Sequence, residues 1–89
     1  MATIRVERVG RFAVFRALKV RVDGNKVATL RNGGTVDVHL TPGTHKISVK
    51  MDWVESDPCE FSIREGESLV FEATGSKVGT RFTVRPKVP

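Results

Sequence analysis

Hydrophobic and polar residues alternate with a period of two along most of the chain. Leu18, Val20 and Val22, for example, alternate with Lys19 and Arg21. Successive side chains of a strand point to opposite faces, so each such run has one apolar and one polar side. This is typical of antiparallel sheets that have one face on a core and one in water. The runs predict strands near residues 2–8, 17–23, 26–31, 35–41, 45–54, 59–64, 67–74 and 79–85.

Turn-forming residues separate these runs. They are Asp23-Gly24-Asn25, Asn32-Gly33-Gly34, Pro42-Gly43, Asp57-Pro58, Glu65-Gly66 and Gly75-Ser76. Glycine and asparagine tolerate positive φ and proline pre-sets the first φ of a turn, so these are turn signals with a physical basis. No window of helical length shows the helical spacing of apolar residues. The pattern predicts one all-β domain over residues 1–89, a seven- or eight-stranded antiparallel β-sandwich of the immunoglobulin or prealbumin kind. Residues 9–16 fit either a continued strand after a glycine bulge or a crossover connection.

Part of the chain, residues 18–54, resembles PEGA-type domains and related sandwiches of the carboxypeptidase-regulatory kind. In that family a strand ending in V-D-G opens a hairpin that carries a lysine, and a later L-x-P-G-x-H turn starts a long strand. The matching residues are Val22, Asp23, Gly24, Lys26, Leu40, Pro42, Gly43 and His45. The family's naming tetrapeptide is replaced by Thr-Pro-Gly-Thr at 41–44. The resemblance implies a non-catalytic module, of a kind often found on bacterial surface or membrane-anchored proteins, and it carries no set of ligand-binding residues.

Charge is distributed unevenly along the chain, whose formal net charge is +5. Residues 1–50 hold ten basic and three acidic residues, whereas residues 51–72 hold seven acidic residues and one basic residue. Two arrangements follow from this. The acidic stretch forms one edge and the molecule is electrostatically two-sided, or the opposite charges pair across the sheets, with each pair worth at most about 1 kcal/mol.

The sequence shows no apolar run of signal-peptide length and no run of the ~20 apolar residues that a membrane helix needs. The single cysteine excludes an internal disulfide. We therefore expect a protein without a transmembrane segment in a reducing compartment, most simply the cytoplasm.

No catalytic or metal-binding constellation is visible. His39 and His45 lack the spacing of a metal pair, so His39 is expected on an exposed strand face and His45 as a turn-capping or half-buried residue beside the Pro42-Gly43 turn. Cys59 shares the parity of Phe61 and is expected to face the core rather than to react. The sequence predicts no catalytic residue, no metal and no cofactor.

Two surfaces are candidates for binding. The first is an acidic loop with a tryptophan, a residue type enriched at interfaces: Asp52, Trp53, Glu55, Asp57 and Glu60. Trp53 has the parity of the core layer, so both a core position and an exposed one stay open. This surface favours a protein partner, and opposed charges also allow a weak homo-oligomer in place of a monomer.

The second surface is a basic stripe for nucleic acid or another polyanion, which forms only if the strands that carry it are neighbours: Lys19, Arg21, Lys46 and Lys50. Nucleic-acid recognition would also need exposed aromatic residues for base stacking, and the outward positions lack them. The sequence therefore predicts a non-catalytic module for protein–protein contact, with polyanion binding as the alternative.

Overall fold

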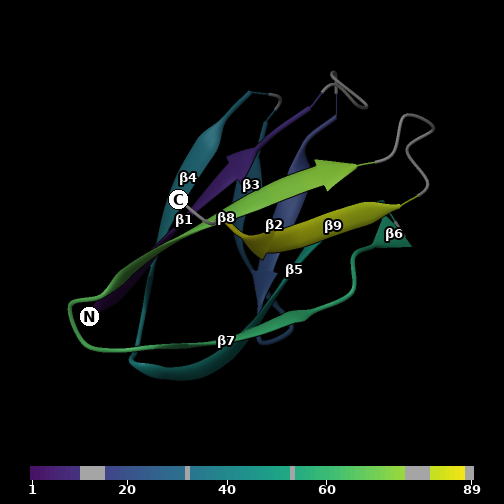
Figure 1. Ribbon diagram of the computed structural model, residues 1–89. Helices are drawn as coiled ribbons and strands as arrows, with labels where there is room; N and C mark the ends of the chain where they lie inside the picture. Colours follow the sequence, from purple (N-terminus) through teal and green to yellow (C-terminus); the bar gives the residue numbers. More distant parts are fainter. Residues whose placement is uncertain (11–15, 32, 53, 76–80, 88–89) are drawn as a thin grey trace.

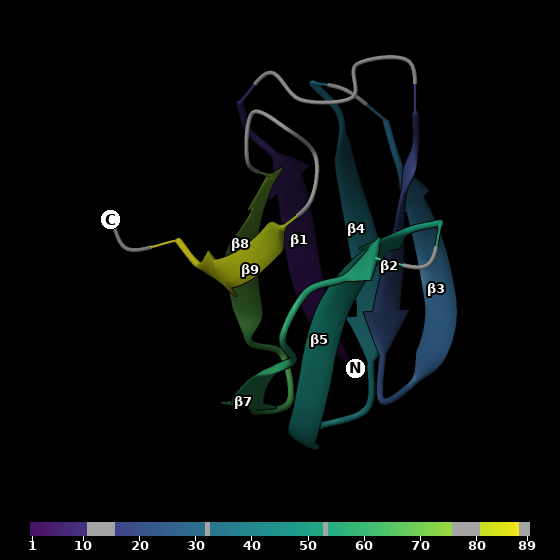
Figure 2. The same cartoon turned by 90° about the vertical axis from the view of Figure 1, so that its right-hand side faces the viewer.

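A computed structural model describes residues 1–10, 16–31, 33–52, 54–75 and 81–87. The described residues form two β-sheets that face each other across one apolar core (Figures 1 and 2). The strands are β1 (Ala2–Arg8), β2 (Leu18–Val22), β3 (Asn25–Leu30), β4 (Thr35–Leu40), β5 (Gly43–Met51), β6 (Val54–Glu55), β7 (Cys59–Ile63), β8 (Ser68–Gly75) and β9 (Phe82–Pro86). The predicted all-β fold with two packed sheets is confirmed.

Sheet A has the order β4-β1-β8-β9, and sheet B has the order β3-β2-β5-β6, with β7 also paired to β5. The chain crosses between the sheets from β1 to β2, from β3 to β4, from β4 to β5 and from β7 to β8. Each crossing places one strand of a sheet against strands of the other, so residues distant in sequence share the core.

The core consists of the side chains that the alternation assigned to the inner faces. Phe71 of β8 is fully buried, and its ring centroid lies 4.9 Å from that of Phe61 on the facing sheet. Edge-to-face and tilted aromatic pairs at this distance add to the free energy of apolar burial. The other large, fully buried side chains are Ile4, Val6, Leu18, Val20, Leu30, Ile47 and Val49.

One strand pair differs from the predicted antiparallel sandwich. β1 pairs with β8 in the parallel direction, from Thr3 opposite Ser68 to Arg8 opposite Ala73. No hairpin joins these strands, because the chain passes through sheet B between them. The direction of β8 is set by this crossover and not by a tight turn, and alternation within a strand carries no information about it.

The predicted strand over residues 45–54 is also corrected. β5 ends at Met51, and the chain reverses so that Met51 pairs with Val54. Asp52 has a φ of 55°, in the left-handed region that aspartate tolerates better than most residues. The predicted acidic loop over 52–60 therefore contains a two-residue strand, β6, and the start of β7.

The turn between β2 and β3 has the form expected for its sequence. Val22 pairs with Asn25, which leaves a two-residue connection in which Asp23 has a φ of 54° and Gly24 a φ of 83°. Positive φ at both positions defines a type I′ turn, and Asp-Gly is among its preferred pairs. This turn holds Asp23 at the end of sheet B, where it meets the start of β5.

The described residues contain no α-helix, and among them no helix is long and apolar enough to cross a membrane. The open question of residues 9–16 falls mostly on residues 11–15, which lie outside the described part of the chain.

Candidate functional site

The outer face of sheet B brings the two predicted surfaces together. β2 lies beside β5, so Lys19 is directly opposite Lys50 and Arg21 is opposite Ser48. The adjacency that the basic stripe required is therefore present. β6 lies on the other side of β5 and places Glu55 opposite Lys50.

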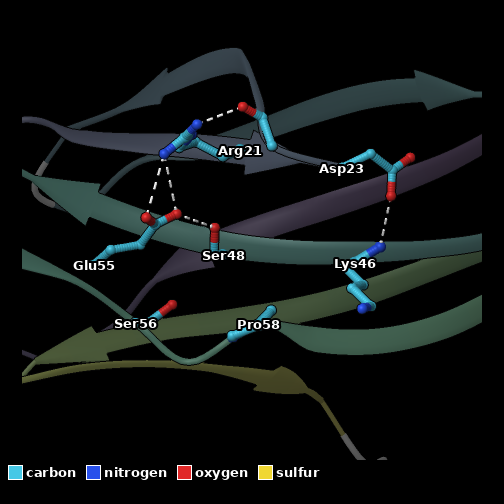
Figure 3. Close-up of a pocket in the computed structure, with 8 residues that line it drawn as sticks. Arg21, Asp23, Lys46, Ser48, Glu55, Ser56 and Pro58 are labelled. Carbon is cyan, nitrogen blue, oxygen red and sulfur yellow. Dashed lines mark hydrogen bonds and ion pairs between the residues drawn. The ribbon is translucent and has the colours of Figure 1, made fainter.

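A shallow groove of about 370 Å³ crosses this face. Arg21 Nη1 lies 3.2 Å from Glu55 Oε1, and the Ser48 hydroxyl donates a hydrogen bond of 2.7 Å to Glu55 Oε2. Figure 3 shows these three side chains converging from β2, β5 and β6. The guanidinium of the predicted basic stripe is thus paired with a carboxylate of the predicted acidic surface. The groove is lined by Arg21, Asp23, Gly24, Lys46, Ser48, Glu55, Ser56 and Pro58.

One wall of the groove is a break in the edge strand of sheet B. The pairing of β5 passes from Lys50–Glu55 to Ile47–Cys59, so three residues on the edge face two on β5. Ser56 fills the gap: its backbone N–H donates to the Val49 carbonyl at 2.8 Å, and its hydroxyl accepts from the Val49 N–H at 3.0 Å. The buried serine replaces a missing backbone acceptor, and the bulge tolerates a proline two residues later.

The other end of the groove is a clasp between the β2–β3 turn and the start of β5. Asp23 Oδ1 accepts the backbone N–H of Lys46 at 2.9 Å, and Asp23 Oδ2 lies 2.6 Å from His45 Nδ1. The second ring nitrogen of His45, Nε2, lies 2.8 Å from the Thr41 carbonyl oxygen. Both nitrogens face acceptors, and only the protonated imidazolium donates from both. The clasp therefore favours the protonated form of His45 beside the carboxylate.

The pKa values of the two groups shift in opposite directions. The hydrogen bond to Asp23, followed by the one to the Thr41 carbonyl, raises the pKa of His45 above 6.5. The hydrogen bond to His45, followed by the one from the Lys46 N–H, lowers the pKa of Asp23 below 3.8. The His45 side chain is 12% exposed and that of Asp23 is 48% exposed, so solvent screens the carboxylate much more than the ring.

The predicted acidic residues do not form one surface. Asp52 forms an ion pair with Arg16, and Glu60 is opposite Lys46 across β5 and β7. Asp57 is exposed at the bulge. Opposite charges therefore pair across strands, which favours the second of the two charge arrangements that the sequence left open. Trp53, the aromatic member of the predicted surface, lies outside the described residues.

A second hollow, a cleft of about 550 Å³, lies between the edges of the two sheets. Glu55, Asp57 and Pro58 line it from sheet B, and Arg81 lies on the side of β9. Glu55 and Pro58 also line the groove described above. The segment 55–59 is thus a ridge with a hollow on either side. The remaining lining residues of this cleft are Cys59, Phe82, Thr83 and Val84.

Arg8 is the polar residue that sequence analysis missed. It is 3% exposed, and its Nη1 donates to the carbonyl oxygens of Arg16 at 2.6 Å and Leu30 at 3.2 Å. Burial lowers the pKa of its guanidinium. The signal was present, because Arg8 shares the parity of Ile4 and Val6 and so lies on the inner face of β1. Its role is to close one end of the sandwich by satisfying backbone carbonyls.

The described residues contain no group of three histidine, cysteine, aspartate or glutamate side chains placed to hold a metal ion. His39 is exposed and its Nδ1 lies 3.2 Å from the Thr3 hydroxyl, on the open outer face of sheet A. Cys59 is half-buried and packs against the core from the edge. Both positions agree with those expected from parity.

Comparison of the chain with protein-family models, with curated proteins and with solved structures gave no match. The resemblance to PEGA-type domains therefore stays a prediction from the residues quoted above.

Proposed function

We propose that this chain is a non-catalytic β-sandwich module, of the immunoglobulin or prealbumin kind and similar to PEGA-type domains, that acts through contact with another protein. The clasp supports the resemblance, because the V-D-G part and the P-G-x-H part of the sequence pattern contact each other there. Asp23 of V-D-G accepts hydrogen bonds from His45 of P-G-x-H and from the next backbone N–H. The residues that carry the resemblance thus hold the β2–β3 turn against the start of β5.

The observation that carries the interaction proposal is the ridge at residues 55–59. An edge strand that is interrupted by a bulge and flanked by a groove and a cleft offers a protein partner both a protrusion and two recesses. Exposed Glu55 and Asp57 sit on this ridge, and Arg81 lies across the cleft. Binding residues are often found on such irregular segments held by a rigid scaffold.

A photo-crosslinking amino acid placed at Asp57 tests this proposal in the native host. We expect a discrete covalent adduct with one protein. The matched control is the same probe at Lys26, an exposed residue on β3 at the opposite edge of sheet B. Adducts that are identical from both positions, or absent at Asp57, would contradict the ridge as the contact surface.

Polyanion binding remains a second candidate because one observation favours it. Lys19 and Lys50 are directly opposite each other on neighbouring strands, and like charges in such a pair destabilise a sheet. In the described part of the chain neither ammonium group forms an ion pair, because the Glu55 carboxylate is held by Arg21 and Ser48. An external anion would relieve this repulsion.

Changing Lys19 and Lys50 together to glutamine should weaken binding to a single-stranded oligonucleotide. The negative slope of log affinity against log salt concentration should become shallower by about 1.4, since each phosphate contact contributes about 0.7 for single strands. The control changes Arg85 and Lys87 to glutamine, which removes the same charge from sheet A. Equal losses in the two double variants would show that only net charge matters and would exclude the stripe.

A further inference from the structure

The four edges of the two sheets differ in how they are protected against pairing with another strand. Natural edge strands are commonly blocked by bulges or by proline. The edge β6–β7 has the Ser56 bulge and Pro58, and the register of β3 shifts opposite Val20 and Arg21. β9 ends in Pro86. Among the described edges β4 alone has neither a bulge nor a proline, and it pairs with β1 in one unbroken register from Thr35 to Leu40.

The backbone groups that β4 presents to its free side follow from its pairing with β1. The Arg8 N–H donates to the Gly34 carbonyl at 3.0 Å, so this pair is hydrogen-bonded. Hydrogen-bonded pairs alternate with non-bonded ones in an antiparallel ladder. The backbone N–H and C=O groups of residues 36, 38 and 40 therefore face β1. The N–H and C=O groups of Thr35, Asp37 and His39 therefore face away from β1, and their side chains are exposed.

A second strand that pairs with β4 must match both its hydrogen bonds and its side chains. In a two-fold antiparallel pair of β4 with itself, residues with outward backbone groups must meet one another. A pair centred on Asp37 or on His39 places identical side chains opposite each other. A pair centred on Val38 places Asp37 opposite the partner copy's His39, and does so twice by symmetry.

The inner face fits the same register. With Val38 at the centre, Val38 meets its own counterpart, and Val36 meets the partner copy's Leu40. All three are core-side residues of β4, buried or half-buried in the single chain. The apolar row of the core thus continues across the two-fold axis, while on the outer face the Asp37 carboxylate, a hydrogen-bond acceptor, meets the imidazole of the partner copy's His39. Cross-strand pairs of both kinds stabilise sheets.

We propose that β4 is a self-association edge at which a second copy of this chain pairs antiparallel around Val38. Sheet A becomes one continuous sheet of two copies, with β4 of each at its centre. The contact is a single strand pair between chains that each carry a net charge of +5, so it forms a weak dimer at high protein concentration. This proposal goes beyond contact with another protein and uses a different surface from the ridge at 55–59.

Sedimentation velocity over a wide concentration range tests the association directly. We expect the average mass to rise from 9.8 kDa toward twice that value. Amide hydrogen exchange followed by NMR in the same series identifies the edge. The amides of Asp37 and His39 should become protected as the concentration rises, whereas those of Val36 and Val38, which face β1, should be protected throughout. A constant monomer mass, or exchange at Asp37 and His39 that does not change with concentration, would overturn the proposal.

Substitutions of His39 separate the contribution of its backbone N–H from that of its side chain. H39P removes an outward N–H but no hydrogen bond to β1, so it should abolish the dimer. H39A is its matched control, since it loses the same imidazole and keeps the N–H, and it should retain a weakened dimer. If H39P fails to fold, H39D gives the answer: it places two carboxylates opposite each other and should weaken the dimer about tenfold. Wild-type association in folded H39P or in H39D would overturn the β4 pairing and leave the ridge unaffected.

Discussion

Replacing Phe71 by alanine should lower the free energy of unfolding by about 3–5 kcal/mol, the cost of deleting a fully buried phenylalanine. The side chain is completely enclosed, and its ring packs on that of Phe61 from the facing sheet. The deletion removes apolar surface from the core and leaves a cavity between two sheets that strand pairing holds in place. Domains of this size have roughly 5–15 kcal/mol of stability, so a large fraction of it would be lost. Urea denaturation measures the difference.

Val70 provides the matched control on the same strand. It precedes Phe71 and points to the outer face of sheet A, where it is only half-buried. Val70→Ala should therefore cost no more than about 1 kcal/mol. If Phe71→Ala leaves too little folded protein to measure, Phe71→Leu gives the same ranking with a smaller loss. Equal costs for the Phe71 and Val70 substitutions would contradict the assignment of the inner face of β8.

Asp23→Asn should lower the free energy of unfolding by about 1 kcal/mol near pH 6, where the clasp is charged on both sides. Asparagine tolerates the positive φ of this position, so the type I′ turn is retained. The substitution removes the negative charge that the imidazolium of His45 faces. Because folding raises the pKa of His45, the protonated ring stabilises the fold, and this contribution is fully present below pH 6.5. It is lost as the pH rises through the pKa of the ring in the folded state.

The lowered pKa of Asp23 acts at the acid end. Its contribution to stability is present above pH 3.8 and is lost as the pH falls through the pKa of Asp23 in the folded state. The difference between wild type and Asp23→Asn should therefore be largest between these limits and shrink on both sides. Urea titrations at a series of pH values measure it.

Asp37→Asn is the control for the clasp. The Asp37 carboxylate is also held by a cation, Arg5, at 2.9 Å, and the pKa of that carboxyl is lowered in the same way. Arginine stays charged at every accessible pH, so the cost of Asp37→Asn should not decline in mildly alkaline solution. A cost of Asp23→Asn that stays constant from about pH 5 to about pH 9 would show that His45 does not titrate against Asp23.

Alternation predicted the faces of the strands well because burial on one side of a sheet imposes period two on every strand. It placed Ile47 and Val49 in the core and His39 outside it, as observed. It failed at Asp52, where the apolar series continues in the sequence although the strand ends. The reason is that an aspartate can adopt a left-handed conformation without the glycine that usually marks such a turn.

The candidate site was predicted only in its components. Arg21 and Glu55 were assigned to two separate surfaces, yet they form one ion pair because β2 and β6 lie on either side of β5. Strand order is decided by how the sheets close over the core, and no local pattern encodes it. The contact between Asp23 and His45 was likewise visible only as two motifs at a distance of 22 residues.

By itself the sequence determined the class of fold, the inner and outer faces of most strands and the position of the tight turns, because each depends on neighbouring residues along the chain. The tertiary structure decided which strands are neighbours, that β1 and β8 run parallel, that opposite charges meet across sheet B, and that Arg8 closes one end of the core. These depend on contacts between residues distant in the chain, which the packing of two sheets selects as a whole.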